Sequence, residues 1–305
     1  MELPVVCFYE NFGYSVSIYE KYDKIGGILS HGIPEYRLDN EILDKWINGI
    51  LSLGMQIEYQ KELGKDFNLS DLEQDYDAIF LSFGANICSD IGCDGEDLTG
   101  VYGGNELLEA ADHPDYMDKA VAVVGGGNVA IDCATVIKKL GAKSVKVIYR
   151  RSEDQMPAEK KEIEYAKKEG VEFLFQTNIL KIIGDKKVER IECIKTELQS
   201  VGIDSMNARK TKPINIPDTN YTLDVDYVIK AIGSKADQDI IKSLGLQTTK
   251  YGYIQVDENY RTSNRKVFAG GDVIGGISTV AAVSKTGREA AREIDKMLTN
   301  LSNRN

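Results

Sequence analysis

The stretch KAVAVVGGGNVAID, at Lys119–Asp132, decides the fold. Its first part, Ala120–Val124, is a short run of small and branched apolar residues, which is typical of a buried parallel strand. The run leads into GGGNVA at 125–130, a glycine-rich dinucleotide fingerprint with alanine in its third glycine position. A helical pattern follows and is expected to end at Gly141. This helix is expected to bury one face, made of Val129, Cys133, Val136, Ile137 and Leu140.

The residue types of the fingerprint suit a bound pyrophosphate. Gly125 permits a tight turn, Gly127 lets the backbone approach the phosphates, and the small Ala130 lets the helix pack close to the strand. The helix N-terminus then faces the negative charge. A glycine loop alone is weak evidence, but strand, glycines, helix and second strand in that order are much stronger. The sequence therefore predicts a dinucleotide-binding unit.

The end of the next predicted strand, Ser144–Tyr149, indicates which dinucleotide is bound. A chain that binds NAD usually carries Asp or Glu here, to accept a hydrogen bond from the ribose 2′-OH. This chain instead continues with Arg150 and Arg151, whose guanidinium groups could hold a 2′-phosphate by charge-assisted bonds. The alternative is a solvated basic pair on the surface. The position within the motif favours NADP(H).

Composition excludes several classes of protein. The 305 residues suffice for two domains, and 28% charged with 42% hydrophobic residues is an ordinary globular balance. A net charge of −11 argues against nucleic-acid binding, and no apolar run approaches the ~18 residues of a membrane helix. The five cysteines are scattered without a CxxC, as expected in a reducing cytoplasm, and two histidines make a histidine-based metal site implausible. We expect no metal site.

Residues near the N-terminus look like a second copy of the same unit. Ser15–Tyr19 resembles Ser144–Tyr149 and is followed by Glu20, the acid expected to hold an adenosine ribose. Val5–Phe12 has helical character, and the spacing of the central motif places the counterpart of Ala130 at Glu2. We therefore expect the chain to begin just after a first glycine fingerprint and to lack that domain's initial strand. The alternative is an ordinary helix and strand.

The remaining patterns predict further elements. Lys24–Leu38 is expected to be an irregular, glycine-punctuated loop, and 94–118 a polar connection with two short helical pieces. Helices are expected at Asn40–Leu53, Ala158–Lys168 and from Ser278 onward. Strands are expected at Met55–Tyr59, Ala78–Phe83, Val171–Gln176, Ile179–Ile183, Val188–Leu198, Asp224–Ile232 and Val267–Ala269.

These patterns divide the chain into α/β domains with one domain inserted in the other. The predicted strand 78–83 ends at Gly84 much as 224–232 ends at Gly233, which indicates a return to the first domain. We expect an FAD-binding-type domain at 1–105, an NADP(H)-binding domain at 106–233 and the second part of the first domain at 234–305.

The assembled motifs resemble those of the small (beta) subunit of bacterial NADPH-dependent glutamate synthase and its relatives. These are flavoproteins with two Rossmann-like domains, related to the pyridine-nucleotide disulfide reductases. The motifs that carry the resemblance are GGILSHGIPEYRL at Gly26–Leu38, GGGNVAID at Gly125–Asp132, YRRSEDQMPA at Tyr149–Ala158, VFAGGDV at Val267–Val273 and STVAAVSKTGREAA at Ser278–Ala291. They span nearly the whole chain.

The resemblance implies a role for individual residues. The NADPH pyrophosphate would lie on the fingerprint, and the 2′-phosphate on Arg150 and Arg151. Glu20 would hold the FAD ribose, and Asp272 the ribityl–phosphate region. The full set of cofactor-binding candidates is Glu20, Gly26, Gly27, Arg37, Gly84, Gly125, Gly127, Asn128, Val129, Ala130, Arg150, Arg151, Gly233, Gly271, Asp272, Thr279 and Val280.

The resemblance also implies an activity and a partner. Hydride would pass from NADPH to FAD, and electrons would pass to a protein that carries iron–sulfur clusters or to the large glutamate synthase subunit. The chain shows no catalytic acid–base constellation, which fits chemistry done by cofactors. It has neither the family's cysteine-rich domain nor the first glycine motif, so a split gene, a late start codon and a decayed copy remain open. The alternative function is an NADP(H)-binding module without turnover. A disulfide reductase is disfavoured by the absence of CxxC.

Overall fold

The chain folds into two units, one inserted in the other. The computed structural model describes residues 13–110, 113–203, 209–276 and 279–302. Unit 1 comprises residues 1–86 and 235–305, and unit 2 comprises residues 87–234. The chain leaves unit 1 at β4 (Ile87–Cys88) and returns at β14 (Ser234–Lys235), and these two short strands pair with each other. The predicted insertion of one domain in another is present.

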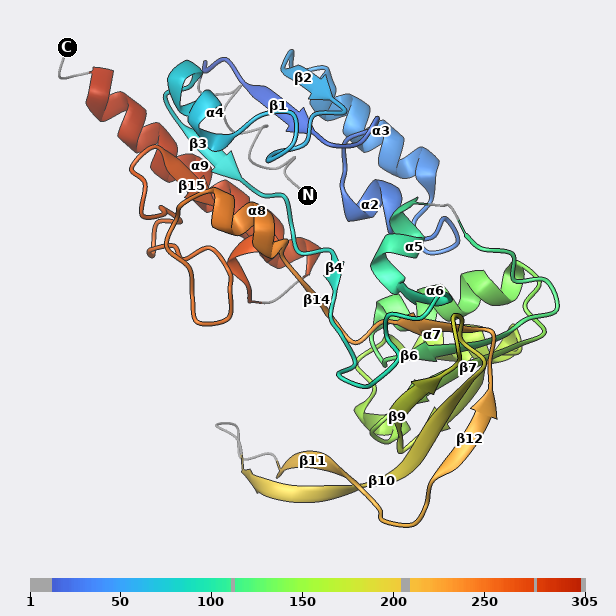
Figure 1. Ribbon diagram of the computed structural model, residues 1–305. Coiled ribbons are helices and arrows are strands. Elements are labelled where there is room, and N and C mark those ends of the chain that lie inside the picture. Colours follow the sequence, from blue (N-terminus) through green and yellow to red (C-terminus); the bar gives the residue numbers. More distant parts are fainter. Residues whose placement is uncertain (1–12, 111–112, 204–208, 277–278, 303–305) are drawn as a thin grey trace. The chain divides into compact units, whose positions relative to one another are not determined.

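Unit 2 is built on a five-stranded parallel sheet in the order β5-β13-β6-β7-β8. Its central strand β6 contains the apolar run of the glycine motif (Figure 1). The strands are β5 (Val101–Gly103), β6 (Ala120–Val124), β7 (Ser144–Tyr149), β8 (Glu172–Phe175) and β13 (Tyr227–Lys230). The helices of this unit are α5 (Gly104–Ala110), α6 (Asn128–Lys139), the short 3-10 helix η1 (Glu153–Gln155) and α7 (Lys160–Lys168).

A second, antiparallel sheet covers one face of the parallel sheet. Its strand β10 (Arg190–Ile203) pairs with β9 (Thr177–Ile183), β11 (Arg209–Asn215) and β12 (Tyr221–Asp224). Along β6 the side chains alternate: Val121 and Val123 pack in the cluster formed with the helices, whereas Ala122 and Val124 pack against the antiparallel sheet. Unit 2 therefore has three layers, and β6 is buried on both faces, which explains its uninterrupted apolar run.

Unit 1 contains two short parallel sheets and five α-helices among its described residues. In one sheet β1 (Ser17–Glu20) pairs with β2 (Gln56–Tyr59), and in the other β3 (Ile79–Leu81) pairs with β15 (Val267–Ala269). The helices are α2 (Ile28–His31), α3 (Asn40–Leu51), α4 (Leu69–Asp75), α8 (Gln238–Ser243), the 3-10 helix η2 (Gly271–Ile274) and the long α9 (Val280–Ser302). Buried Phe268 of β15 packs with Ala291 and Ile294 of α9, so the C-terminal helix is tied to the second sheet.

Most predicted elements are present, with three corrections. The polar connection expected at 94–118 contains strand β5, which belongs to the unit 2 sheet, so the units divide at 86/87 rather than at 105/106. The expected loop at 24–38 contains the single-turn helix α2. Strands β11 and β12 were not expected, and the predicted strand 224–232 is split between β12 and β13.

One side chain predicted to be buried is exposed, and the apolar residues of α3 do not all lie on its buried face. Leu140, predicted on the buried face of its helix, is 46% exposed just beyond the end of α6. On α3, Ile42 is 63% and Trp46 45% exposed, whereas Leu43, Ile47 and Ile50 form the buried face. Helical periodicity finds the apolar stripe but overestimates its width, because an apolar residue at its margin need not be buried.

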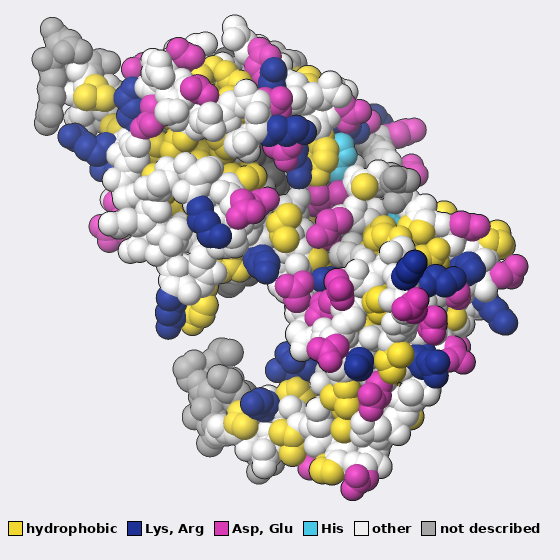
Figure 2. Space-filling model, viewed as in Figure 1, with side chains coloured by type: hydrophobic (Ala, Val, Ile, Leu, Met, Phe, Trp, Pro, Cys, Tyr) yellow, Lys and Arg dark blue, Asp and Glu magenta, His cyan; other side chains and the backbone are white. Residues whose placement is uncertain are grey.

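Some expectations lie outside the described residues. These are the helical segment Val5–Phe12, the fingerprint counterpart at Glu2 and the helix start at Ser278. Within the described parts of the chain, no helix is both long and apolar enough to cross a membrane. Basic and acidic side chains are interspersed on the face shown in Figure 2.

Candidate functional site

The glycine motif lies at the carboxyl edge of the parallel sheet of unit 2, where the strand order reverses. The chain runs from β6 through β7 to β8 on one side, whereas β13 lies on the other side of β6. Gly125 follows β6, and its backbone has a φ of +144°, which favours glycine. A Cβ at this position would lie 2.1 Å from the carbonyl oxygen of Ala231, which follows β13. The motif thus occupies the switch point at which open α/β sheets bind ligands.

Gly127 provides open space at the start of α6. It is the N-cap residue of this helix, and no described heavy atom lies within 4 Å of a Cβ built on it. No side chain among the described residues caps the helix. The first N–H groups of α6, including those of Asn128 and Val129, have no acceptor within the helix. An uncapped twelve-residue helix that begins beside an open glycine has the donors and the room that a pyrophosphate requires.

The other fingerprint residues shape this cradle. Ala130 is fully buried. A Cβ built on Gly125 would lie 3.4 Å from the Cβ of Ala130, so a larger side chain at position 130 would push α6 away from β6. The Asn128 side chain accepts a hydrogen bond from Glu159 N at 3.1 Å. This bond occupies the side-chain oxygen of Asn128, while its backbone N–H at the start of α6 has no acceptor within the helix.

Tyr149, the last residue of β7, packs against the motif. A Cβ on Gly126 would lie 2.5 Å from the Tyr149 ring, so only glycine fits opposite this ring without displacing it. The Tyr149 hydroxyl donates to the carbonyl oxygen of Gln155 at 2.8 Å. Burial raises the pKa of the Tyr149 phenol, although the neighbouring Arg151 and Arg150 act in the opposite direction. The phenol is therefore protonated at neutral pH and can donate this bond.

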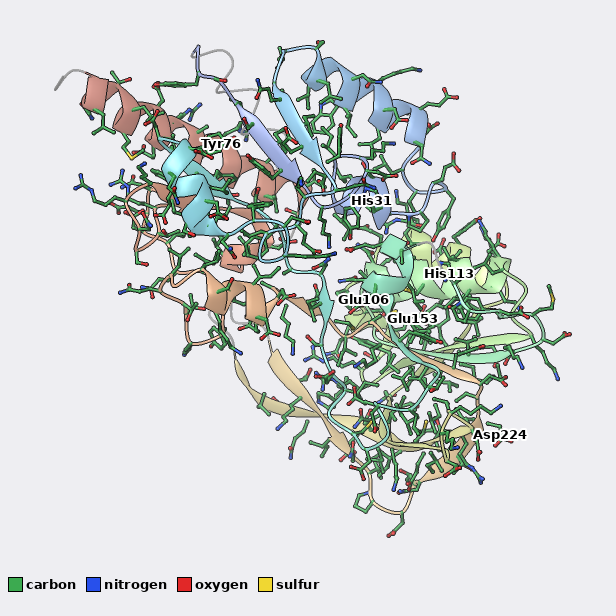
Figure 3. The ribbon with its side chains drawn as sticks, turned by 45° about the horizontal axis from the view of Figure 1, so that its top comes forward. His31, Tyr76, Glu106, His113, Glu153 and Asp224 are labelled. Carbon is green, nitrogen blue, oxygen red and sulfur yellow. The ribbon has the colours of Figure 1, made fainter. Side chains whose placement is uncertain are left out.

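Arg150 and Arg151 follow directly, at the position where a ribose-binding acid would stand. Arg150 is exposed and Arg151 is half-buried. Within the described residues neither guanidinium group forms an ion pair, which leaves both free to bind an anion. The loop continues through Glu153, labelled in Figure 3, which forms an ion pair with Lys167 of α7. Sequence and structure thus bring the fingerprint and the arginine pair to one edge of one sheet.

The candidates in unit 1 lie at the ends of its strands. Glu20 ends β1, and its carboxylate accepts the N–H of Tyr22 at 3.0 Å. Asp272 follows β15 within η2, and its neighbour Gly271 donates its N–H to Thr286 Oγ1 at 2.9 Å. The two sheets of unit 1 therefore each end in a carboxylate, where the sequence predicts ribose and phosphate contacts.

The remaining unit 1 candidates lie in loops and at helix ends. Gly26 and Gly27 have φ of +124° and +54° and lead into α2, in the same glycine-punctuated segment as Arg37. Thr279 accepts the N–H of Ala282 at 3.2 Å and so caps α9, where Val280 is 51% exposed. The other glycines predicted here have positive φ, at Gly84, Gly233 and Gly271. Gly233 belongs to unit 2.

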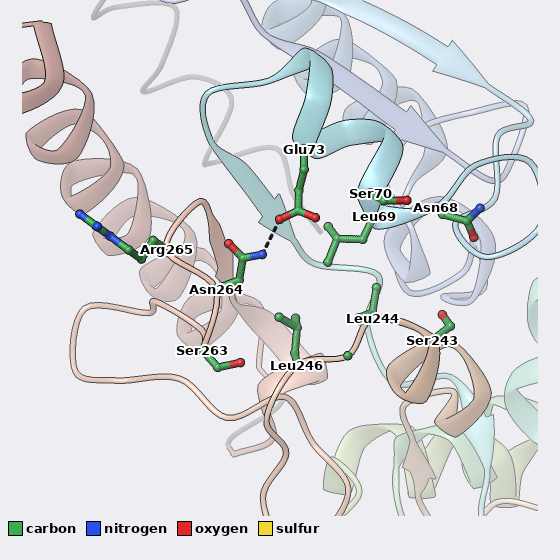
Figure 4. Close-up of a pocket in the computed structure, with 11 residues that line it drawn as sticks. Asn68, Leu69, Ser70, Glu73, Ser243, Leu244, Leu246, Ser263, Asn264 and Arg265 are labelled. Carbon is green, nitrogen blue, oxygen red and sulfur yellow. Dashed lines mark hydrogen bonds between the residues drawn. The ribbon is translucent and has the colours of Figure 1, made fainter. Parts of the chain in front are cut away.

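A separate pocket of about 730 Å³ lies in unit 1 (Figure 4). It contains none of the predicted cofactor-binding residues. Leu69, Leu244 and Leu246 contribute its apolar part, and Asn264 donates a hydrogen bond to Glu73 on its wall. The pocket is lined by residues 68–70, 73, 243–246 and 263–265.

The described cysteines are unsuited to thiol chemistry. Cys88, Cys93, Cys133 and Cys193 are free thiols. Burial raises the pKa of Cys93 to about 11 and that of Cys193 to about 12, and it also raises the pKa of Cys88 and Cys133. The thiolate is the reactive form, so none of these four is an activated nucleophile. In the same part of the chain, no group of three or more His, Cys, Asp or Glu could hold a metal ion.

Lys230, the last residue of β13, is held by two carboxylates. Its ammonium group lies 2.8 Å from Asp90 and 3.3 Å from Glu96. Burial works against the charge on Glu96, but the backbone N–H groups of Cys93, Ile91 and Gly92 and the Lys230 ammonium outweigh it. The pKa of Glu96 therefore lies below its usual value.

We expect Glu96→Gln to lower the free energy of unfolding at neutral pH. A carboxylate with a depressed pKa stabilises the fold above its unfolded-state pKa, and this contribution is lost as pH falls through the folded-state pKa. The stability gap between variant and wild type should therefore narrow from about pH 7 to about pH 4 in urea unfolding experiments. Glu197→Gln, at an exposed position of β10, is the control. A Glu96→Gln protein as stable as wild type at neutral pH would contradict the assignment.

Sequence reasoning missed several residues of the site. Ala231 packs against Gly125, and Tyr149 packs against Gly126. Thr196 and Thr211 form hydrogen bonds with the loop at residues 150–155, which we call the arginine loop. One signal was available, since Gly126 is the middle of three consecutive glycines and stands where the fingerprint itself does not require glycine. The contacts of Thr196 and Thr211 had no signal, because they depend on where the antiparallel sheet lies.

Comparisons with known proteins show which family the chain resembles. Residues 8–287 match the family described as pyridine nucleotide-disulphide oxidoreductase. The chain is 36% identical over 293 residues to the NADP(+)-dependent formate dehydrogenase subunit beta of Moorella thermoacetica, covering 94% of this chain and 41% of that protein. It is 32% identical over 294 residues to the glutamate synthase (NADPH) small chain of Halomonas elongata, covering 91% and 61%. The chain thus spans about half the length of these curated relatives.

A solved structure shows the same fold. FprA of Mycobacterium tuberculosis, in complex with NADPH, superposes with a TM-score of 0.83 at 16% identity, covering 99% of this chain and 83% of FprA. The predicted fold class is therefore confirmed, and the resemblance to the glutamate synthase small subunit agrees with the relatives found. The family match extends over most of the chain. The chain belongs to the pyridine nucleotide-disulphide oxidoreductase family.

Proposed function

We propose that this chain is an NADPH-dependent flavin oxidoreductase that supplies electrons to a partner protein. Unit 2 binds NADP(H) at the glycine motif, and unit 1 binds FAD at the ends of its two parallel sheets. The relatives are named as NADPH- or NADP(+)-dependent oxidoreductase components, which supports the choice of nucleotide.

The observation that carries the proposal concerns two guanidinium groups and a helix N-terminus at one edge of the unit 2 sheet. Within the described residues, the guanidinium groups form no ion pair and no side chain caps the helix. Arg150 and Arg151 follow β7 where an NAD-binding chain usually carries an acid. The open space at Gly127 and the free N–H groups of α6 fit a pyrophosphate. Together they provide one positive site for the pyrophosphate and another for the 2′-phosphate, which distinguishes NADPH from NADH.

The residues of unit 1 fit FAD by their chemistry. Glu20 at the end of β1 is the acceptor that a ribose hydroxyl requires, and Asp272 follows β15 within a glycine-rich turn. When both groups are bound, NADPH supplies a hydride and FAD accepts it. The protein's task is to bind and orient them, in keeping with the absence of an activated thiol or metal cluster among the described residues.

The partner is proposed from the relatives. They are a "subunit beta" and a "small chain", names that belong to assemblies of several polypeptides. We infer a partner that carries iron–sulfur clusters or corresponds to the large glutamate synthase subunit, and that accepts electrons from the flavin. The free thiols of the described cysteines support a cytoplasmic location.

Flavin reconstitution tests the proposal. The full chain is purified, incubated with FAD and freed of unbound flavin, and its absorption spectrum is recorded. We expect a yellow protein whose flavin absorption is bleached by NADPH under anaerobic conditions, and more slowly by NADH at the same concentration. FAD mixed with bovine serum albumin is the control for non-enzymatic reduction.

Two results would change the proposal. A colourless chain that takes up no FAD yet binds NADPH would replace it with the NADP(H)-binding module. A yellow chain that NADPH and NADH reduce at the same rate would keep the flavin site and overturn the nucleotide preference.

A further inference from the structure

The loop that carries the two arginines is fastened to the antiparallel sheet of unit 2. The Thr196 hydroxyl, on β10, donates to the carbonyl oxygen of Arg150 at 2.9 Å. Thr196 is only 3% exposed, so this bond is shielded from water. The carbonyl oxygen of Arg151 accepts the N–H of Gln176 at 3.0 Å. Both peptide groups that orient the guanidinium side chains are therefore held by residues of the antiparallel layer or its border.

A second attachment fixes the far end of the loop. Gln155 donates from Nε2 to Thr211 Oγ1 on β11 at 2.8 Å, and its carbonyl oxygen accepts the Tyr149 hydroxyl at 2.8 Å. The turn between Arg151 and Gln155 is thus closed on one side by Tyr149 and on the other by β11.

Gln176 is itself held by β10. Its backbone has a φ of +48°, a conformation that non-glycine residues rarely adopt. It is stabilised by a bond from Thr196 N to Gln176 O at 2.8 Å. Thr196 therefore supports the loop twice, directly through Arg150 and indirectly through the residue that bonds Arg151.

We propose that Thr196 and Thr211 are positioning residues for recognition of the 2′-phosphate, so that the β10–β11 hairpin is part of the selectivity for NADP(H). The inference rests on the proposed function. Neither hydroxyl touches the nucleotide in this scheme. They act by holding Arg150 and Arg151 in place before the phosphate arrives, which reduces the ordering cost of binding.

The test is the ratio of affinities for NADPH and NADH, measured by calorimetry on the full chain. Thr196→Val keeps the shape of the side chain and removes the hydroxyl. We expect its NADPH affinity to fall about threefold to tenfold, the range of one hydrogen bond, with NADH affinity unchanged. Thr196→Ser, which keeps the hydroxyl, should restore most of the preference for NADPH.

Thr177→Val is the matched control. Thr177 is 1% exposed and its hydroxyl also donates to a backbone carbonyl, that of Phe175, at 3.1 Å. If loss of a buried hydroxyl merely disturbed the fold, Thr177→Val and Thr196→Val would have the same effect. Each would then lower the affinity for NADPH and the affinity for NADH by the same factor. If Thr196→Val does not fold, Thr211→Val at a half-buried position gives the same comparison.

The outcomes separate this inference from the proposed function. A wild-type chain with equal affinity for NADPH and NADH overturns this inference together with the NADPH preference in the proposed function. A wild-type preference for NADPH that Thr196→Val and Thr211→Val leave unchanged overturns only the role of the hairpin. A preference reduced as much by Thr177→Val as by Thr196→Val overturns it as well.

Discussion

Replacing Arg150 and Arg151 by alanine together should reduce the preference for NADPH over NADH by on the order of a hundredfold. Each charge-assisted bond to a phosphate is worth about 1.5–3 kcal/mol, and the exposure of Arg150 favours the lower value. Two such bonds give about 3 kcal/mol, which corresponds to roughly two powers of ten in affinity. NADH affinity should change little, since NADH has no 2′-phosphate.

Titration of wild type and variant with both nucleotides measures this effect. Arg190→Ala, at an exposed position of β10, is the matched control for loss of a surface charge. Raising the salt concentration should weaken NADPH binding by the wild type more than by the double variant, because exposed charges are screened. Equal affinities of the wild type for the two nucleotides would contradict the assignment of both arginines.

The parallel core of unit 2 could be predicted from the sequence because its signals are local. The run Ala120–Val124 is apolar at every position, and the structure buries it between helices and the antiparallel sheet. Gly141, predicted to end its helix, has a φ of +94° just beyond α6. A strand, a turn and a helix in sequence each leave a pattern within a few residues.

The antiparallel sheet and β5 were harder to predict because their signals depend on partners. Val101–Gly103 is only three residues long, and it is a strand because it lies beside β13. β11 contains Lys210, Lys212 and Pro213, which are poor strand formers, and it is held by pairing with β10. In neither segment do apolar and polar residues alternate clearly enough to predict a strand from the sequence alone.

The residues of the candidate site also fall into those with a local sequence signal and those placed by distant partners. Gly125, Gly127 and Ala130 were predicted with physical roles that match their surroundings, because the fingerprint is contiguous. The support of the arginine loop by Thr196 and Thr211 joins residues far apart in the sequence. Long-range hydrogen bonds of this kind leave no trace in spacing, so they could be found only in the structure.

The largest effects are expected at two glycines of the fingerprint, and they should differ in kind. Gly125→Ala places a methyl group 2.1 Å from the Ala231 carbonyl oxygen, at a φ of +144°. Backbone strain of about 1–3 kcal/mol and a similar cost of overpacking predict a loss of roughly 2–6 kcal/mol of stability. This variant should unfold unit 2 at lower denaturant concentration.

Gly127→Ala should leave the fold nearly intact and weaken the binding of both nucleotides. Its φ of −86° suits any residue, and no described heavy atom lies within 4 Å of the added methyl group. Loss of glycine at an N-cap costs at most about 1 kcal/mol. The methyl group would instead occupy the space into which the pyrophosphate must come.

The two kinds of variant identify which phosphate each element holds. A methyl group at Gly127 should weaken NADPH and NADH by the same factor, more than about tenfold, because both carry the pyrophosphate. Loss of the arginines should weaken NADPH alone. Calorimetry with both nucleotides and urea unfolding of the same samples distinguish these patterns. If Gly127→Ala bound NADPH like wild type, the pyrophosphate would not lie at the N-terminus of α6, and the nucleotide site would have to be placed elsewhere in the chain.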